Sequence, residues 1–226
     1  MTDASWLNRV TELLPNILQT LLLGAGTTVM LTATSFVLAA VLGFILALMR
    51  RSEWLPLSGL ARAYLEIFRN VPILTQLFIL YFGLARLDIT LPATMAAILG
   101  FGLNGAAILS EVFRASINAV DRGQSEAALA IGMTPAQAFR SIIFPQAFPI
   151  ALPSTGNFLI GLLKDTSLAS AAAVPELAFR ARMLVSETYL TTEIYLAVAL
   201  IYLLLSLPIA QFAKWAERRF LPQKAA

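Results

Sequence analysis

Long runs of apolar residues, separated by short polar segments, dominate the pattern of this 226-residue chain. A helix that crosses a membrane needs about 20 mostly apolar residues, and five segments reach or approach that length. We expect spans over residues 17–49, 71–84, 91–109, 147–163 (extending toward 174) and 194–212, with a helical lead-in over 61–70. The pattern therefore predicts an all-α, polytopic integral membrane protein with one domain over residues 1–226.

The amino-acid composition indicates a membrane protein without catalytic or metal-binding residues. Hydrophobic residues make up 58% of the chain and charged residues 13%, against about 45–50% and about 25% in typical soluble proteins. The chain has no cysteine and no histidine, which excludes disulfides, thiol nucleophiles, Ser-His catalytic pairs and the usual zinc ligands. We therefore expect no catalytic residue and no metal site. The first residues lack the order of a cleavable signal peptide, so the first span itself is expected to direct insertion.

The basic residues predict an orientation. The net charge is +3, but these residues flank apolar runs and form no continuous patch, which argues against a nucleic-acid partner. Positively charged residues favour the cytoplasmic side of a membrane, and most lie on one side of the five expected spans. The residues on that side are Arg50, Arg51, Arg62, Arg114, Arg122, Arg140, Lys214, Arg218, Arg219 and Lys224. This predicts an N-terminus outside, a C-terminus inside, and a cytoplasmic loop over about residues 114–146.

A polar stretch within that loop, residues 126–145, carries strong helix start and stop signals. Glu126 is followed by alanines on a helical pattern, and Gly132 is expected to end the helix because glycine accepts the left-handed conformation common at helix ends. Thr134 and Pro135 then begin a second helix, and Gln137 completes a capping-box signature. The stretch therefore predicts a helix, a tight turn and a second helix.

The same stretch resembles the EAA loop of permease subunits in bacterial ATP-binding-cassette importers. The residues that carry the resemblance are Glu126, Ala127, Ala128, Gly132, Ile142 and Pro145. Phe144 stands where the motif usually has leucine, which exchanges one hydrophobic residue for another. Residues 151–177 and 66–84 are similar to the subfamily that imports polar amino acids, of the histidine, glutamine and glutamate type. The resemblance covers roughly residues 15–220, nearly the whole chain, and three separate motifs in the right order make it specific.

The resemblance implies a transmembrane subunit in the bacterial inner membrane that imports polar amino acids by alternating access. This chain has no G-x-x-x-x-G-K-[ST] loop and is expected to bind no cofactor itself. A separate cytoplasmic ATPase subunit would bind Mg-ATP. The other implied partners are a second permease copy, identical or paralogous, an extracytoplasmic amino-acid-binding protein, and membrane lipid.

The resemblance also implies which residues couple the chain to the ATPase. They are Glu126, Ala127, Ala128, Gly132, Arg140 and Pro145. The alternative for this stretch is an amphipathic hairpin that rests on the bilayer surface. Arg140 either faces the partner or only contributes to the positive-inside bias.

A second group of polar residues lies in or beside the expected spans. Charged side chains near the membrane centre cost about 2.5–3.5 kcal/mol on insertion scales, so they require a reason. The candidates for a translocation path are Gln76, Tyr81, Asn104, Lys164, Asp165, Thr166 and Ser167. Lys164 and Asp165 either contact an amino acid's carboxylate and ammonium, or neutralise each other or a neighbouring helix. Asn104, among small residues, either packs helices together or contacts substrate.

Two further interpretations remain open. Glu66, Arg69 and Asn70, just before Pro72, form either an exposed helix or a contact with a gate or the paired permease. The whole chain could instead be a stand-alone secondary carrier or channel for small polar solutes, although the sequence shows neither an inverted repeat nor a relay of buried carboxylates. A structural or signalling membrane protein whose loop docks a regulator is the third possibility.

Overall fold

The computed structural model describes residues 3–220, with side chains from residue 11 onward, so Lys224 lies outside the described residues. Over this range the chain is helical and contains no strand, which confirms the all-α prediction. The α-helices are α1 Asp3–Met49, α2 Leu55–Asn70, α3 Ile73–Phe78, α4 Ala93–Asn118, α5 Arg122–Ala130, α6 Pro135–Ala138, α7 Phe144–Asp165, α8 Leu177–Thr188 and α9 Thr191–Phe220. The π-turns η1 Ile79–Gly83 and η3 Phe139–Ile143, and the 3₁₀ segments η2 Leu84–Leu87 and η4 Thr166–Ala172, join them.

Three single helices are long and apolar enough to cross a membrane, and two bent helix pairs raise the total to as many as five. The single helices are α4, α9 and the part of α1 over Thr11–Met49. The first bent pair consists of α2, which contains the expected lead-in, and the Ile73–Leu87 segment, which covers most of the second expected span; the two meet at 102°. The second consists of the Pro135–Ala172 segment, which contains the expected fourth span over 147–163, and α8, which follows at 53°. The five-span expectation therefore holds when each bent pair is counted as one span.

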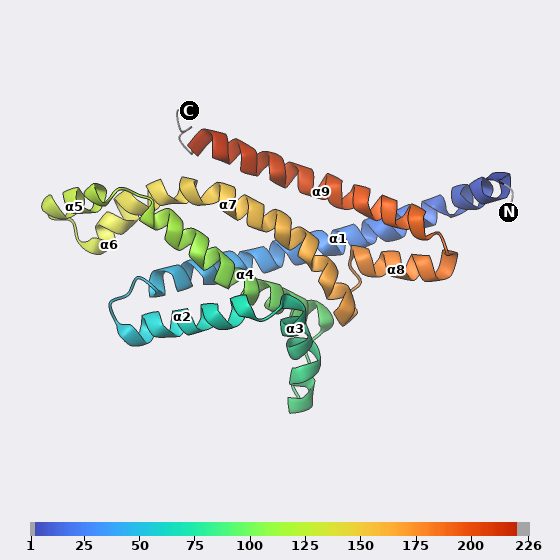
Figure 1. Cartoon of the computed structure of the whole chain (residues 1–226), viewed down its shortest axis with the longest axis horizontal. Helices are drawn as coiled ribbons and strands as arrows, with labels where there is room; N and C mark the ends of the chain where they lie inside the picture. Colours follow the sequence, from blue (N-terminus) through green and yellow to red (C-terminus); the bar gives the residue numbers. More distant parts are fainter. Residues whose placement is uncertain (1–2, 221–226) are drawn as a thin grey trace.

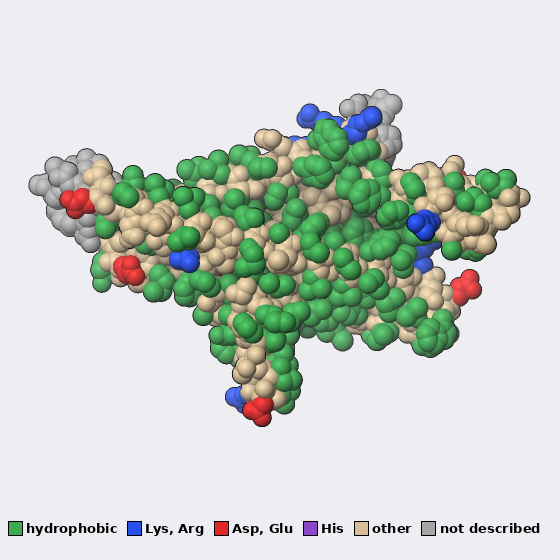
Figure 2. All heavy atoms as spheres, turned by 180° about the vertical axis from the view of Figure 1, so that it is seen from behind, with side chains coloured by type: hydrophobic (Ala, Val, Ile, Leu, Met, Phe, Trp, Pro, Cys, Tyr) green, Lys and Arg blue, Asp and Glu red, His purple; other side chains and the backbone are tan. Residues whose placement is uncertain are grey.

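The helices form an elongated body with one projecting arm (Figure 1). α1 runs through most of its length, and α4, α7 and α9 lie along it. The arm consists of α3, η1 and η2, and we keep this name below. α5 and α6 lie at one end of the body, whereas α8 and the N-terminus lie at the other. Figure 2 shows mostly hydrophobic side chains over the body, with charged groups concentrated at its ends and at the tip of the arm.

Close helix approaches at small residues hold the body together. A Cβ atom added to Gly43 of α1 would lie 2.9 Å from the backbone oxygen of Ala106 in α4. One added to Gly102 of α4 would clash with the side chain of Leu38 in α1, with the Leu38 Cγ atom 2.8 Å away. These distances are too short for real side-chain carbons, so small residues set the spacing of α1 and α4, as expected for helix pairs in membranes.

Prolines lie within two of the long helices. Pro208 lies inside α9, which continues through it to Phe220. Pro145 lies in the first turn of α7, and Pro149 and Pro153 lie inside that helix. The π-turn η3 directly precedes α7.

Candidate coupling loop and translocation path

The end of α5 has the geometry that the sequence predicts. Gly132 adopts a φ of +84°, in the left-handed region. The N–H of Gly132 donates to the carbonyl of Leu129 at 3.0 Å, and the N–H of Met133 donates to that of Ala128 at 3.1 Å. This is the pattern of a Schellman-type helix end. At the start of α5, the N–H of Gly123 donates to the Asp121 carboxylate at 2.7 Å.

The start of α6 also matches the prediction. The Thr134 hydroxyl oxygen accepts a hydrogen bond from the N–H of Gln137 at 3.3 Å. The Gln137 side-chain oxygen in turn accepts from the N–H of Thr134 at 2.9 Å. Pro135 occupies the first turn of the helix. The capping box is therefore present, and it fixes the direction in which the chain leaves the turn.

Most of the predicted coupling residues are exposed. Glu126, Ala127 and Arg140 face outward, whereas Ala128 is buried against the rest of the loop. Within residues 11–220, neither Glu126 nor Arg140 makes an ion pair. Pro145 is set apart, since it belongs to the first turn of α7. α6, η3 and α7 follow each other without a gap, so continuous helical backbone connects the exposed α5–α6 hairpin to α7.

Gln76 and Asn104 meet at the bend between α2 and α3. The amide group of Asn104 donates to the carbonyl of Phe68 at 2.7 Å. That of Gln76 donates to the same carbonyl at 3.0 Å and to the carbonyl of Val71 at 2.8 Å. The break before Pro72 leaves these carbonyls without helical donors, so both side chains stabilise the bend. The side-chain oxygen of Gln76 is buried and has no partner in the described part of the chain.

Lys164 and Asp165 end α7 on different sides. Asp165 and Asn104 line one cavity of about 110 Å³ between α4 and α7. Lys164 and Ser167 line another of about 430 Å³, which Tyr202 of α9 also borders. Consecutive helical residues point about 100° apart, which explains the separation. Neither charge makes an ion pair within residues 11–220.

The two remaining path candidates lie apart from these cavities. The Thr166 side chain is fully buried and donates its hydroxyl to the carbonyl of Leu163 at 2.7 Å. Tyr81 lies on the arm, with its ring 4.7 Å from that of Phe82. The structure therefore brings together Asn104 with Asp165 and Lys164 with Ser167, and leaves Thr166 and Tyr81 outside both groups.

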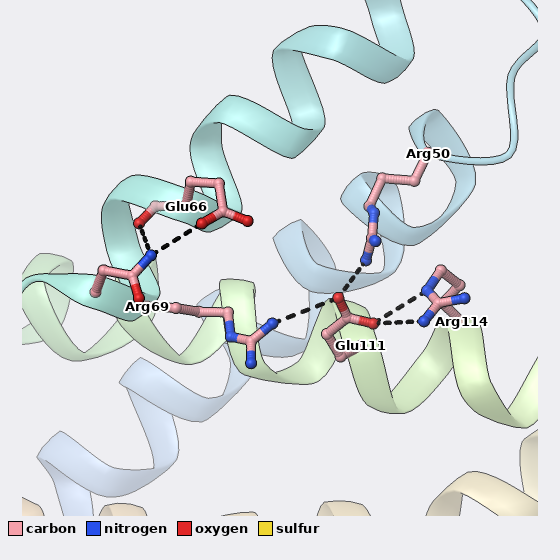
Figure 3. Close-up of polar contacts among 6 residues, drawn as sticks. Arg50, Glu66, Arg69, Glu111 and Arg114 are labelled. Atoms are coloured by element: carbon pink, nitrogen blue, oxygen red, sulfur yellow. Dashed lines mark hydrogen bonds and ion pairs between the residues drawn. The ribbon is translucent and has the colours of Figure 1, made fainter.

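A charged cluster that the sequence analysis did not single out joins three helices (Figure 3). The carboxylate of Glu111 in α4 lies 2.6 Å from Arg50, 2.9 Å from Arg114 and 3.5 Å from Arg69. Arg50 directly follows α1 and Arg69 belongs to α2, so one carboxylate ties the ends of both helices to α4. The only signal in the sequence is an acidic residue three positions before Arg114 in an apolar run, which indicates nothing about Arg50 or Arg69.

Comparison with known proteins decides the family. Residues 39–222 match the family of inner membrane components of binding-protein-dependent transport systems. The chain belongs to this family. It is 42% identical over 199 residues to YxeN of Bacillus subtilis, a probable amino-acid permease protein, over 87% of this chain and 89% of that one. It is 39% identical over 215 residues to PatM of Vibrio harveyi, a probable amino-acid ABC transporter permease protein, over 94% and 95% of the two chains.

A solved structure supports the same family assignment. An amino acid ABC transporter, crystallised with histidines, has a chain that superposes on this permease with a TM-score of 0.85 at 34% sequence identity. The match covers 91% of this chain and 96% of the other. The resemblance inferred from the sequence motifs is thereby confirmed, and the chain is a multi-pass inner-membrane component.

The permease also has a buried polar network at the opposite end of the body from α5 and α6. Glu176 is fully buried, and its carboxylate accepts hydrogen bonds from the N–H groups of Ala178 and Phe179 at 2.8 and 2.7 Å and from the Tyr202 hydroxyl at 3.3 Å. The hydroxyl oxygen of Thr28 accepts from the N–H of Leu177 at 3.2 Å. The network joins α1, α8 and α9. Sequence analysis missed it, because Thr28 and Tyr202 are far from Glu176 along the chain.

Proposed function

We propose that this permease imports polar amino acids as the transmembrane subunit of an ATP-binding-cassette importer. Its N-terminus lies outside, and its C-terminus and the α5–α6 hairpin lie in the cytoplasm. There a separate ATPase subunit binds Mg-ATP, and an extracytoplasmic binding protein delivers the amino acid on the other side. The names of the relatives support the amino acid, and the positions of the basic residues support the orientation.

The α5–α6 hairpin is the observation that carries this proposal. It is exposed, it is held by its own caps, and its charged residues Glu126 and Arg140 make no ion pair within residues 11–220. We propose that the hairpin inserts into a groove on the ATPase. Closure of the ATPase dimer then moves the hairpin and α7 together. One such hairpin per chain requires a second permease copy, so that both ATPase subunits are engaged, and the two copies rock about a central path.

The cavities at the end of α7 suggest the path. Asp165 offers an acceptor for the substrate's ammonium group, with Asn104 in the same cavity. Lys164 offers a donor for its carboxylate from the neighbouring cavity, with Ser167 beside it. Unpaired charges within a membrane are expensive, and a zwitterionic amino acid that passes between them would compensate both.

The test is ATP hydrolysis and uptake by the permease reconstituted with the ATPase encoded beside it, with and without the neighbouring binding protein and a panel of amino acids. Hydrolysis that one loaded binding protein stimulates would support the importer and identify its substrate. Hydrolysis that never depends on this chain would overturn the proposal and favour a secondary carrier.

Variants sharpen the test. The double variant Glu126→Ala/Arg140→Ala should lose co-purification with the ATPase, because it removes one unpaired charge from α5 and another from η3, directly after α6. Arg62→Ala is the matched control, since Arg62 is also exposed and belongs to the same set of basic residues expected on the cytoplasmic side. Equal ATPase binding by the double variant and the control would contradict a coupling role for the hairpin.

A further inference from the structure

Two neighbouring cavities, one apolar and one with basic side chains in its lining, lie near the α5–α6 hairpin, and together we call them the groove. Its apolar part is a cavity of about 170 Å³ between α1, α4 and α7. Its polar part is a cavity of about 320 Å³ at the junction of α4 and α5. Ile117 lines both cavities, so the two parts adjoin.

Aromatic rings form the wall of the apolar part. Phe44 of α1 makes edge contacts with Phe113 of α4 at 6.0 Å and with Phe144 of α7 at 5.6 Å between ring centroids. The lining includes one polar side chain, Ser116, whose hydroxyl donates to the carbonyl of Val112 and is therefore turned to its own helix. Phe148, which is 54% exposed, borders the opening. The cavity thus opens sideways and offers no group that would bind a polar ligand.

The polar part offers hydrogen-bond donors. Arg122 and the Ser125 hydroxyl have no hydrogen bond or ion pair within residues 11–220, and Arg51 contacts only the side-chain oxygen of Asn118, at 2.9 Å. The carboxylate of Asp121 also lines the cavity, but it accepts from the N–H of Gly123. The charges of Arg51, Arg122 and Asp121 therefore sum to +1. The nearby cluster of three arginines around Glu111 adds a further excess of two.

At each of α1, α4 and α7, the residues that line the polar part lie nearer one membrane face than those that line the apolar part. Phe44 precedes Arg51 by seven residues, and Phe113 precedes Asn118 by five. Phe148 follows Ile143 of the polar part by five. At a rise of about 1.5 Å per residue these offsets are about 7–11 Å. The headgroup region of one leaflet is about 5–8 Å thick, from the difference between total and hydrocarbon thickness. The offset therefore matches the step from a lipid headgroup to its acyl chains.

We propose that this groove binds one anionic phospholipid. Its phosphate contacts Arg51, Arg122 and Ser125, and an acyl chain lies against Phe44, Phe113 and Phe148. The excess of positive charge selects an anionic over a zwitterionic headgroup, and the apolar cavity selects a diacyl lipid over a free phosphate. The inference rests on the membrane placement of the family and not on the identity of the imported amino acid.

Native mass spectrometry of the permease–ATPase complex tests the proposal. The complex is taken from bilayers of equal phosphatidylglycerol and phosphatidylcholine, and the retained lipids are counted. Wild type should retain phosphatidylglycerol. The variant Arg51→Gln/Arg122→Gln should bind it about 30-fold more weakly, since each basic residue near an anionic surface contributes a factor of about five. Arg62→Gln, the matched control, should bind as wild type does.

Two further measurements distinguish a diacyl lipid from a free phosphate. Ala151→Phe fills the apolar cavity and should release the diacyl lipid while the thermal unfolding temperature of the complex is checked against wild type. Glycerol phosphate, added as a soluble headgroup, should not displace the lipid. Equal retention of phosphatidylcholine, displacement by glycerol phosphate, or unchanged retention in the double arginine variant would each overturn the site. Loss of ATPase binding in that variant, with lipid still retained, would assign the polar cavity to the ATPase interface instead.

Discussion

Two helix starts in this permease, those of α6 and α8, supply acceptors in different ways to the first backbone N–H groups, which have no acceptor within the helix itself. The start of α6 uses residues three positions apart, Thr134 and Gln137, and both are exposed. The start of α8 uses the fully buried Glu176, together with Thr28 and Tyr202 from distant parts of the chain. The first is a local device and keeps a surface free for a partner. The second locks three helices together, so it should matter far more for stability.

The largest effect is expected for Glu176→Ala. It would leave two partly buried N–H groups and the Tyr202 hydroxyl without their acceptor, and an unsatisfied buried group costs about 1–3 kcal/mol. We expect the free energy of unfolding in detergent to fall by about 3 kcal/mol or more. Glu176→Gln keeps one acceptor oxygen and should lose less. If Glu176→Ala lowers the free energy of unfolding no more than a cap variant at the start of α6, the two helix starts do not differ in their contribution to stability.

The next effect compares two glycines of α1. A Cβ on Gly24 would lie 2.8 Å from the Cα of Leu177 at the start of α8, whereas one on Gly26 would meet nothing within 4 Å. Overpacking typically costs about 1–3 kcal/mol, so Gly24→Ala should lower the unfolding temperature and Gly26→Ala should not. The comparison isolates the approach of α1 to α8. Equal melting curves would show that this contact adapts without cost.

Gly132→Val tests the turn between α5 and α6. No atom lies within 4 Å of the added Cβ, so strain comes from the φ of +84° alone, at about 1–2 kcal/mol. We expect insertion into the membrane to be normal and uptake by the reconstituted importer to be abolished, because the hairpin loses its direction. Gly132→Asn should retain part of the uptake, since asparagine tolerates this conformation better. Normal uptake by the valine variant would count against a coupling role.

The smallest effect is expected for Thr134→Ala. Loss of one exposed helix cap costs about 1 kcal/mol, and the hairpin contributes little to the body. The unfolding temperature of the permease should barely change, while ATPase activity stimulated by the binding protein should fall by a few-fold. Thr134→Ser keeps the hydroxyl and should behave as wild type. A large drop in stability would show that the hairpin is not an independent unit.

The same comparison explains what the sequence revealed. The α5–α6 hairpin was predictable because Gly132, Thr134 and Gln137 act on neighbours within a few residues. The contact of Asn104 with the carbonyl of Phe68, and those of Thr28 and Tyr202 at the start of α8, were not predictable, because these partners lie in other helices. Lys164 and Asp165 illustrate the limit within one helix: adjacency suggested a shared contact, but helical rotation places them in different cavities. Glu111 was missed because three helix ends must first be assembled around it.

The length of α1 has a mechanical consequence. At about 1.5 Å per residue its 47 residues extend for about 70 Å, well beyond the roughly 40–45 Å of a bilayer with its headgroups. The middle of α1 contacts the start of α8 at Gly24, and its C-terminal end is followed by Arg50 in the Glu111 cluster. The rise from Gly24 to Met49 is about 38 Å, so a change in tilt of about 5° about Gly24 would displace the Arg50 end by about 3 Å. One continuous helix therefore links the contact with α8 mechanically to the Glu111 cluster.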